Sequence, residues 1–246
     1  MIGATIVGLP VLGALACVLV VYVGAVMQAA TGVGVGILSS PVLLFVDPDF
    51  IPAAVVVAVL PLTFSVAIAD RSHIDRHGVA AALIGRVPGL ILGAVVVAAI
   101  SDDVLAILVS TTVLLGVAVS MTTKRFTPTT PALVIAGFGS GFTGTAVGVG
   151  GPPIALTYQH SDPVTMRATI SFFFSVGSVL TAIALFAAGE LGWRQLELVA
   201  LLLPSVLLGL ATARRFKHRL VGSAVRPLVL GLSAFSAVAL LVRTLA

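Results

Sequence analysis

The sequence GVGGPP at residues 148–153 interrupts an apolar region with no charged residue between positions 131 and 159. Glycine loses backbone entropy in a helix interior, and proline lacks the N–H group and clashes with the preceding turn. The run therefore cannot lie in the middle of an ordinary helix. A similar stretch, TGVGVG at residues 31–36, is followed by Pro41. We interpret the two stretches as halves of one binding site.

The surrounding chain is too apolar for a soluble domain. Of its 246 residues, 59% are hydrophobic and 9% are charged, and the mean hydropathy is +1.22. A soluble domain carries about 25% charged residues. Apolar runs of about 20 residues between short polar turns indicate helices, because the strands of a membrane barrel would alternate. We expect an all-α integral membrane protein with one domain of eight to ten segments, spanning residues 1–246.

Several other classes of site are not indicated. Cys17 is the single cysteine and lies in an apolar run, so we expect neither a disulfide nor a thiol-based centre. We expect no metal, because the four histidines pair with no cysteine and form no HExxH motif. The net charge is +4, and the basic residues lie in short loops between the spans. This distribution indicates orientation in a membrane and not nucleic acid binding. No nucleophile–base set accompanies the glycines, so we expect no enzyme and no cofactor. Without Lys or Arg in residues 1–8, we expect no cleavable signal peptide.

The apolar segments of the chain differ in length, and their lengths indicate which of them can cross a membrane. Residues 37–46 are too few to cross about 30 Å of hydrocarbon at about 1.5 Å per residue. Residues 132–159 are too few for two full spans, so we expect a hairpin of two short helices there. Full spans are expected at residues 9–30, 51–69, 79–100, 104–121, 168–188, 198–213 and 221–242.

The basic loops predict the orientation of these segments. Arginine and lysine lie at residues 71–76, 124–125 and 214–219, and such loops are usually cytoplasmic. Counting spans between them places the first broken hairpin on the outer side and the second on the inner side. We therefore expect both chain termini to be extracytoplasmic.

The two halves of the chain, residues 9–121 and 131–245, also match in sequence. GVG at residues 34–36 aligns with residues 148–150, and PGLILG at residues 88–93 aligns with PSVLLG 116 residues later. An inverted repeat with a broken segment in each half indicates the binding site of a secondary transporter. We predict two such halves, each a broken-helix hairpin plus three transmembrane helices.

A small anion fits the predicted centre. Helices expected from Ile37 and Ile154 onward would present backbone N–H groups and positive dipole ends to it. The alternative is that the glycines only allow close helix packing. Arg86 lies near the centre of residues 79–100, where a charge costs at least about 2.5–3.5 kcal/mol unless paired or hydrated. We interpret it as facing the anion, and the alternative is a structural partner such as Asp70 or a cluster of carbonyl groups at a helix break.

Neutral donors flank both glycine stretches, although Ser and Thr often bond to carbonyl groups of their own helix. Ser171, Ser175 and Ser178 share a helix face and are interpreted as packing residues. Arg167 begins a span at the inner boundary, where orientation is its first interpretation and a gate its second. The predicted substrate-binding residues are Gln28, Thr31, Gly32, Gly34, Gly36, Pro41, Arg86, Thr145, Gly148, Gly150, Gly151 and Pro152.

The motif QAATGVG at residues 28–34, leading to Pro41, and GVGGP at residues 148–152 resemble the paired signatures of the TauE/SafE-type sulfite exporter family. PGLILG and GWR at residues 192–194 also fit, so the resemblance covers nearly the whole chain. The first half departs slightly, because the family often has three consecutive glycines where this chain has GVG.

The resemblance implies a carrier of the bacterial inner membrane that exports sulfite or an organosulfonate such as sulfoacetate by secondary transport. Its partners are then the small anion and the lipid bilayer, and a coupling proton and a homo-oligomer stay open. The acids lie almost all in loops, which argues against a proton site inside the membrane. The alternatives are an anion channel and a carrier for another small organic anion, such as a carboxylate.

Overall fold

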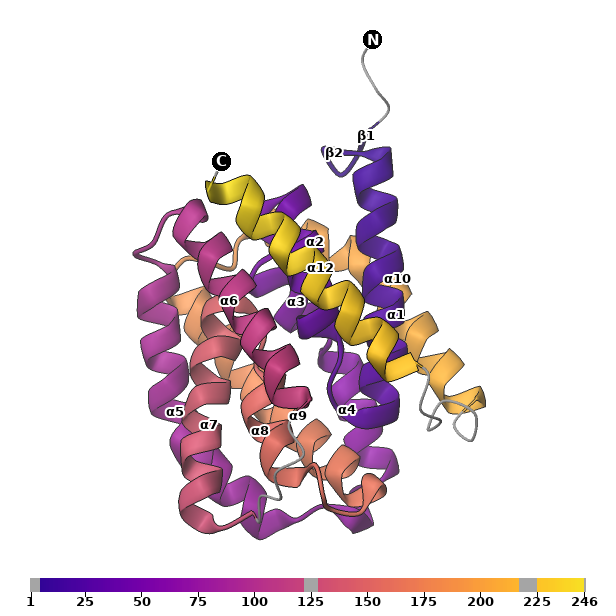
Figure 1. Cartoon of the computed structure of the whole chain (residues 1–246), viewed down its shortest axis with the longest axis vertical. Helices are drawn as coiled ribbons and strands as arrows, with labels where there is room; N and C mark the ends of the chain where they lie inside the picture. The colour runs from indigo at the N-terminus through magenta and orange to yellow at the C-terminus, as the bar shows by residue number, and fades with distance from the viewer. Residues whose placement is uncertain (1–4, 122–127, 217–224, 246) are drawn as a thin grey trace.

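The computed structural model describes residues 5–121, 128–216 and 225–245, with side chains in the last segment from residue 230 onward (Figure 1). Apart from a short hairpin of β1 (Thr5–Ile6) and β2 (Leu9–Pro10), the described elements are helical. The first half contains α1 (Val11–Thr31), α2 (Val35–Val46), η1 (Pro48–Phe50), α3 (Ala53–Ala58), α4 (Leu60–Ala69), η2 (Arg71–His73), α5 (Arg76–Val97) and α6 (Asp102–Ser120). The second contains α7 (Thr130–Val147), α8 (Gly151–Tyr158), α9 (Pro163–Ala187), α10 (Trp193–Arg215) and α12 (Val225–Leu245).

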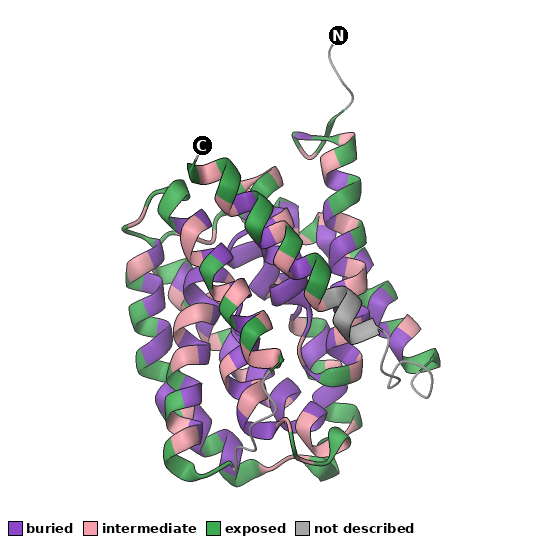
Figure 2. Ribbon diagram, in the orientation of Figure 1, coloured by how far each residue is buried: buried purple, intermediate pink, exposed green. Residues whose placement is uncertain are grey.

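Six of the described helices are long and apolar enough to cross a membrane: α1, α5, α6, α7, α9 and α10. Shorter apolar helices cover residues 35–46, 53–69 and 230–245. Large apolar side chains such as Leu12, Leu19 and Ile84 are exposed. Exposed residues lie along the helices at the outside of the bundle (Figure 2). Such apolar faces suit contact with lipid, and an α-helix satisfies its own backbone N–H and C=O groups there. The expected all-α, multi-pass membrane protein is confirmed.

Two of the expected segments have different boundaries. Residues 51–69 were expected to form one span, but the helix is interrupted at Val59, and Pro61 occupies the first turn of α4. The expected hairpin of two short helices at residues 132–159 is wrong, because α7 has 18 residues and only α8 is short, with 8. Proline is tolerated in the first turn of a helix, so α8 begins at the glycines and not after the prolines.

The chain breaks occupy equivalent places in the two halves. α1 is followed by Gly32 at φ 90° and α7 by Gly148 at φ 73°, both left-handed conformations that favour glycine. The short helices begin three residues later, at Val35 and Gly151. Equivalent positions of the two breaks are therefore 116 residues apart, which is also the offset of the PGLILG element. The expected alignment of GVG with GVG, at an offset of 114, was displaced by two residues, because the equivalent positions are set by backbone conformation and not by residue type.

Helices of the two halves pack against each other in reciprocal pairs. α5 packs along α7 and α1 along α10, while α2 contacts α12 and α6 contacts α8. The beginning of α1 and the end of α12 lie at the same end of the molecule in Figure 1. This arrangement agrees with the predicted inverted repeat and with termini on one side, both of which stay predictions. Lys124, Arg125 and residues 217–219 of the basic loops lie outside the described residues.

Glycines bring α5 and α7 into backbone contact. A Cβ on Gly85 or Gly89 would overlap carbonyl oxygens of α7, and a Cβ on Gly137 or Gly141 would overlap carbonyl oxygens of α5. Small residues at such positions let membrane helices approach closely. The contact places the middle of α5, with Arg86, directly against the second half of the chain.

Candidate functional site

A cavity of about 50 Å³ lies where the two chain breaks meet. One buried water needs about 10–15 Å³, so this space is large enough for a small anion or a few waters. Valines and an isoleucine of the first half and Phe174 and Ser178 of α9 form much of the wall. Seven of the predicted substrate-binding residues also line it: Gln28, Gly34, Gly36, Arg86, Gly148, Gly150 and Gly151.

The two breaks touch each other at this cavity. A Cβ on Gly36 would overlap the carbonyl oxygen of Gly148, and a Cβ on Gly151 would overlap the side chain of Val33. The glycines therefore allow one half of the chain to approach the other within backbone contact. Residues 112 positions apart in sequence, Gly36 and Gly148, form the same small volume.

Arg86 lies beside the cavity and is only 2% exposed. Its Nη1 donates a hydrogen bond to Ser140 Oγ at 3.3 Å, and its guanidinium carbon lies 4.7 Å from the ring centre of Phe173. Its Nε has no hydrogen-bond partner among the described residues. A buried cation without a carboxylate is costly, so the position favours an anionic ligand.

The alternative partner suggested by the sequence, Asp70, is not bonded to Arg86. Asp70 accepts hydrogen bonds from Nε and Nη2 of Arg167, at 2.8 and 2.5 Å. Within the described residues, Arg86 forms no ion pair. That structural explanation of its charge is therefore wrong.

The backbone of α2 adds donors to the cavity. The Gln28 side chain accepts a hydrogen bond from the Val35 N–H at 3.0 Å and so caps the helix. The next two N–H groups, of Gly36 and Ile37, belong to the first turn and have no intrahelical acceptor. α2 begins at Val35 and not at Ile37, and both Gly36 and Ile37 line the cavity. The N-terminus of α2 therefore favours negative charge there.

The N-terminus of α8 contributes less than expected. It begins at Gly151 and not at Ile154, so Pro152 and Pro153 occupy its first turn. Proline carries no N–H group, and two of the usual first-turn donors are missing. The two breaks are therefore unequal as anion sites, and α2 is the stronger.

Two predicted side-chain donors are occupied elsewhere. The Thr31 hydroxyl donates to the carbonyl groups of Met27 and Val33, at 3.0 and 2.8 Å, which is the local bonding weighed as its alternative. Thr145 is fully buried and shares a hydrogen bond of 3.0 Å with Thr181. Neither threonine lines the cavity.

Three further predicted residues shape the breaks without lining the cavity. Gly32 supplies the left-handed turn after α1. Pro41 is buried inside α2, and Pro152 occupies the first turn of α8 beside Gly116, where an added Cβ would lie 2.6 Å from the proline ring. Their positions give them a structural role around the site.

Sequence reasoning missed the residues that hold Arg86. Ser140 on α7 also donates to the Gly150 carbonyl at 2.6 Å and so joins Arg86 to the second break. Gly177 on α9 leaves the space that the guanidinium fills, because a Cβ there would overlap it. Ser178 was interpreted as a packing residue but lines the cavity. The serine periodicity on α9 was the only available signal.

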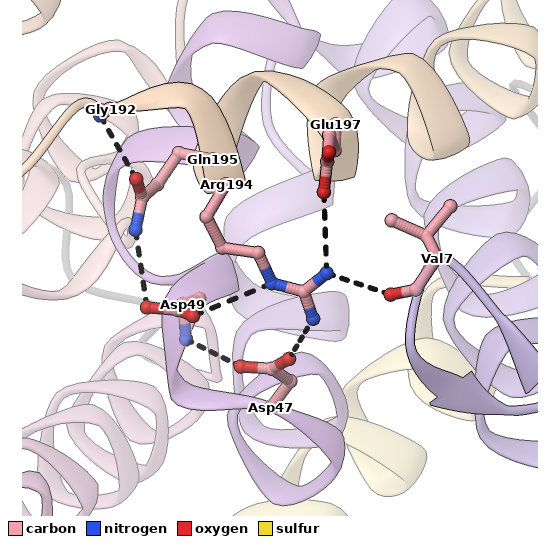
Figure 3. Close-up of polar contacts among 7 residues, drawn as sticks. All are labelled: Val7, Asp47, Asp49, Gly192, Arg194, Gln195 and Glu197. Carbon is pink, nitrogen blue, oxygen red and sulfur yellow. Dashed lines mark hydrogen bonds and ion pairs between the residues drawn. The ribbon is translucent and has the colours of Figure 1, made fainter.

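Arginines of the second half bind both ends of the α3–α4 segment. At one end, Arg167 of α9 pairs with Asp70, which follows α4. At the other end, Arg194 of α10 pairs with Asp47 at 2.6 Å and donates to the Val7 carbonyl at 2.7 Å (Figure 3). Arg194 also lies 3.6 Å from Asp49, so it joins the N-terminal hairpin, the turn after α2 and α10. Valines 55, 56 and 59 of the clamped segment line the cavity.

Comparisons with known proteins agree with this architecture. A family profile described as "Sulfite exporter TauE/SafE" matches residues 16–240. A protein of Cupriavidus necator, described as a probable sulfite/organosulfonate exporter TauE, is 27% identical over 204 residues, covering 78% of this chain and 80% of the relative. A search of solved structures found no match. Because the profile covers nearly the whole chain, the protein belongs to the TauE/SafE sulfite exporter family of membrane transporters.

Proposed function

We propose that the protein is a secondary transporter that exports sulfite, or an organosulfonate such as sulfoacetate, across the bacterial cytoplasmic membrane. The substrate is held between the two glycine-rich breaks near the bilayer midplane. The observation that carries this proposal is the buried Arg86, which has no carboxylate partner among the described residues and lies at a cavity where α2 begins. Family membership supports the export of a sulfur oxyanion.

The cavity offers both charge and neutral donors to such an anion. The Nη2 atom of Arg86 lies 3.8 Å from where a Cβ on cavity-lining Gly144 would stand. Gln28 and Ser178 lie in the same wall, and backbone N–H groups of α2 complete it. Charge-assisted hydrogen bonds from arginine suit the oxygens of an oxyanion such as sulfite or a sulfonate. The apolar remainder of the wall, including Phe174, accommodates a short organic group.

The reciprocal helix pairs support alternating access between two inverted halves. The segment α3–α4 forms one wall of the cavity and is bound at its ends by Arg167 and Arg194. We propose that the Arg167–Asp70 pair is the inner gate and that the Arg194 cluster closes the outer side. Release of one pair at a time would open the cavity to one side of the membrane.

The test is the affinity of the purified full-length protein for sulfite, sulfoacetate, taurine, sulfate and small carboxylates. Arg86→Gln should weaken binding of the preferred anion about 10- to 100-fold, since a charged hydrogen bond contributes about 1.5–3 kcal/mol. Arg243→Gln is the control, because it removes an exposed arginine whose contacts, with the carbonyl and ring of Phe45, lie outside the cavity lining. Unchanged affinity of Arg86→Gln for all five ligands would remove Arg86 from the site, and a unitary conductance would identify a channel.

A further inference from the structure

A second cavity, of about 60 Å³, lies at the inner end of the α3–α4 segment. Its wall comes from α1, α4, α9 and α10, and four of the lining residues are alanines, which leave the space open. The charged side chains in this wall are Asp70, Arg167 and Arg214. Two guanidinium groups therefore face the cavity with a single carboxylate.

The more deeply buried cation of this cavity is Arg167, which is 5% exposed. Its Nε and Nη2 atoms both donate to one oxygen, Oδ2 of Asp70. Its Nη1 atom has no hydrogen-bond partner among the described residues. Arg214 is exposed and donates to the hydroxyl of Ser65. Both arginines thus keep donor capacity for a further oxyanion.

We infer that this inner cavity is a second anion-binding site, in which a small oxyanion replaces the Asp70 carboxylate on Arg167 and is also bound by Arg214. The inference rests on the proposed function, because it names the step by which a substrate anion reaches the central cavity. Arginine binds carboxylates and sulfur or phosphorus oxyanions through the same planar array of donors. The exchange keeps Arg167 paired, so a buried cation is never left without a partner.

The position of the inner cavity connects it to the central one. Ala29 and Ala30 of α1 line the inner cavity, and the preceding residue, Gln28, lines the central cavity. A Cβ on Gly32, at the first break, would lie 3.3 Å from Cα of Arg167. The last turn of α1 therefore separates the two cavities. An anion that displaces Asp70 also releases α4 from α9, which links occupancy of the inner cavity to opening of the inner gate.

The experiment uses the full-length protein in nanodiscs of phosphatidylcholine alone, with sulfite as the probe and Arg86→Gln as the background in which the central site is weakened. Adding Asp70→Asn should tighten sulfite binding at least about tenfold, because the competing carboxylate is removed. Adding Arg167→Gln should abolish binding, and adding Arg214→Gln should weaken it about tenfold. Adding Arg243→Gln, which removes an arginine that does not line this cavity, should leave sulfite affinity unchanged.

Stability provides a second measurement. Asp70→Asn leaves Arg167 without its carboxylate, so sulfite should raise the unfolding temperature of this variant more than that of the wild type. If Asp70→Asn does not fold, Arg214→Gln decides, because it leaves the Arg167–Asp70 pair intact. The inference is overturned if Asp70→Asn folds and does not tighten binding, or if Arg214→Gln has no effect.

A lipid headgroup offers the same oxyanion chemistry and is separated by a further arm. Stabilisation by added phosphatidylglycerol that Arg167→Gln removes, without any sulfite binding, would assign the cavity to lipid and overturn the inference. The same variants distinguish failure of the inner site from failure of the proposed central site. If Arg86→Gln loses all sulfite binding and adding Asp70→Asn does not restore it, the inner site is refuted and the central site stands. If Arg86→Gln binds sulfite as the wild type does and adding Arg167→Gln abolishes that binding, the central site is refuted and the inner site stands.

Discussion

Replacement of Gly177 by alanine should displace Arg86 without removing its charge. A Cβ at this position would overlap the Nε, Cζ and Cδ atoms of Arg86. Both residues are buried between α5 and α9, so the guanidinium must move and lose its contact with Phe173 and its hydrogen bond to Ser140. Overpacking of a filled interior costs about 1–3 kcal/mol, and we expect a loss of stability in that range.

Anion binding should fall with the displaced guanidinium. Loss of one charged hydrogen bond corresponds to about 1.5–3 kcal/mol, or about a 10- to 100-fold weaker affinity for sulfite. The assay is a sulfite titration of the purified variant, with thermal unfolding measured in parallel. Gly231→Ala is the control, because a Cβ on Gly231 meets nothing within 4 Å and alanine is the better helix former.

A double variant separates crowding from general damage. Gln is shorter than Arg, so Arg86→Gln in the Gly177→Ala chain should recover stability but not sulfite binding. Such non-additivity is expected for residues in direct contact. Wild-type sulfite affinity in Gly177→Ala would refute the placement of Arg86 against α9 and the reasoning built on it.

Two further predictions concern the break and a helix end. Gly36→Ala should lower stability by about 1–3 kcal/mol and weaken sulfite binding in the central cavity, because its Cβ would overlap the carbonyl of Gly148; wild-type unfolding temperature would contradict the contact. The Thr165 backbone N–H donates to Asp162 and lowers the pKa of that carboxyl below its ordinary value of about 3.9. The stabilisation is therefore present above the ordinary pKa and is lost as pH falls through the folded pKa. Asp162→Ala should lower the unfolding temperature at pH 7, and the difference from wild type should shrink toward pH 3; a difference independent of pH would exclude the carboxylate.

The sequence alone was sufficient to predict the family but not to predict which residues line the site. The family follows from motifs that are contiguous, and the profile match confirms it. Thr31 and Arg86 were both predicted as ligands, yet only Arg86 lies at the cavity. A threonine on a helix can satisfy itself on a carbonyl group four residues back, whereas arginine carries a charge that no local group in α5 neutralises.

The sequence by itself determined the apolar helical character of the chain, the two glycine-rich stretches at which it breaks and the presence of a cation inside α5. These follow from local properties: the length of the apolar runs, the runs of glycine and proline, and the absence of an acid near Arg86 in the chain. Only the tertiary structure decided that Asp70 pairs with Arg167, that Ser140 bonds to Arg86 and that Gly177 makes room for it. Each of these contacts joins different helices, and helix packing, not sequence neighbours, brings such residues together.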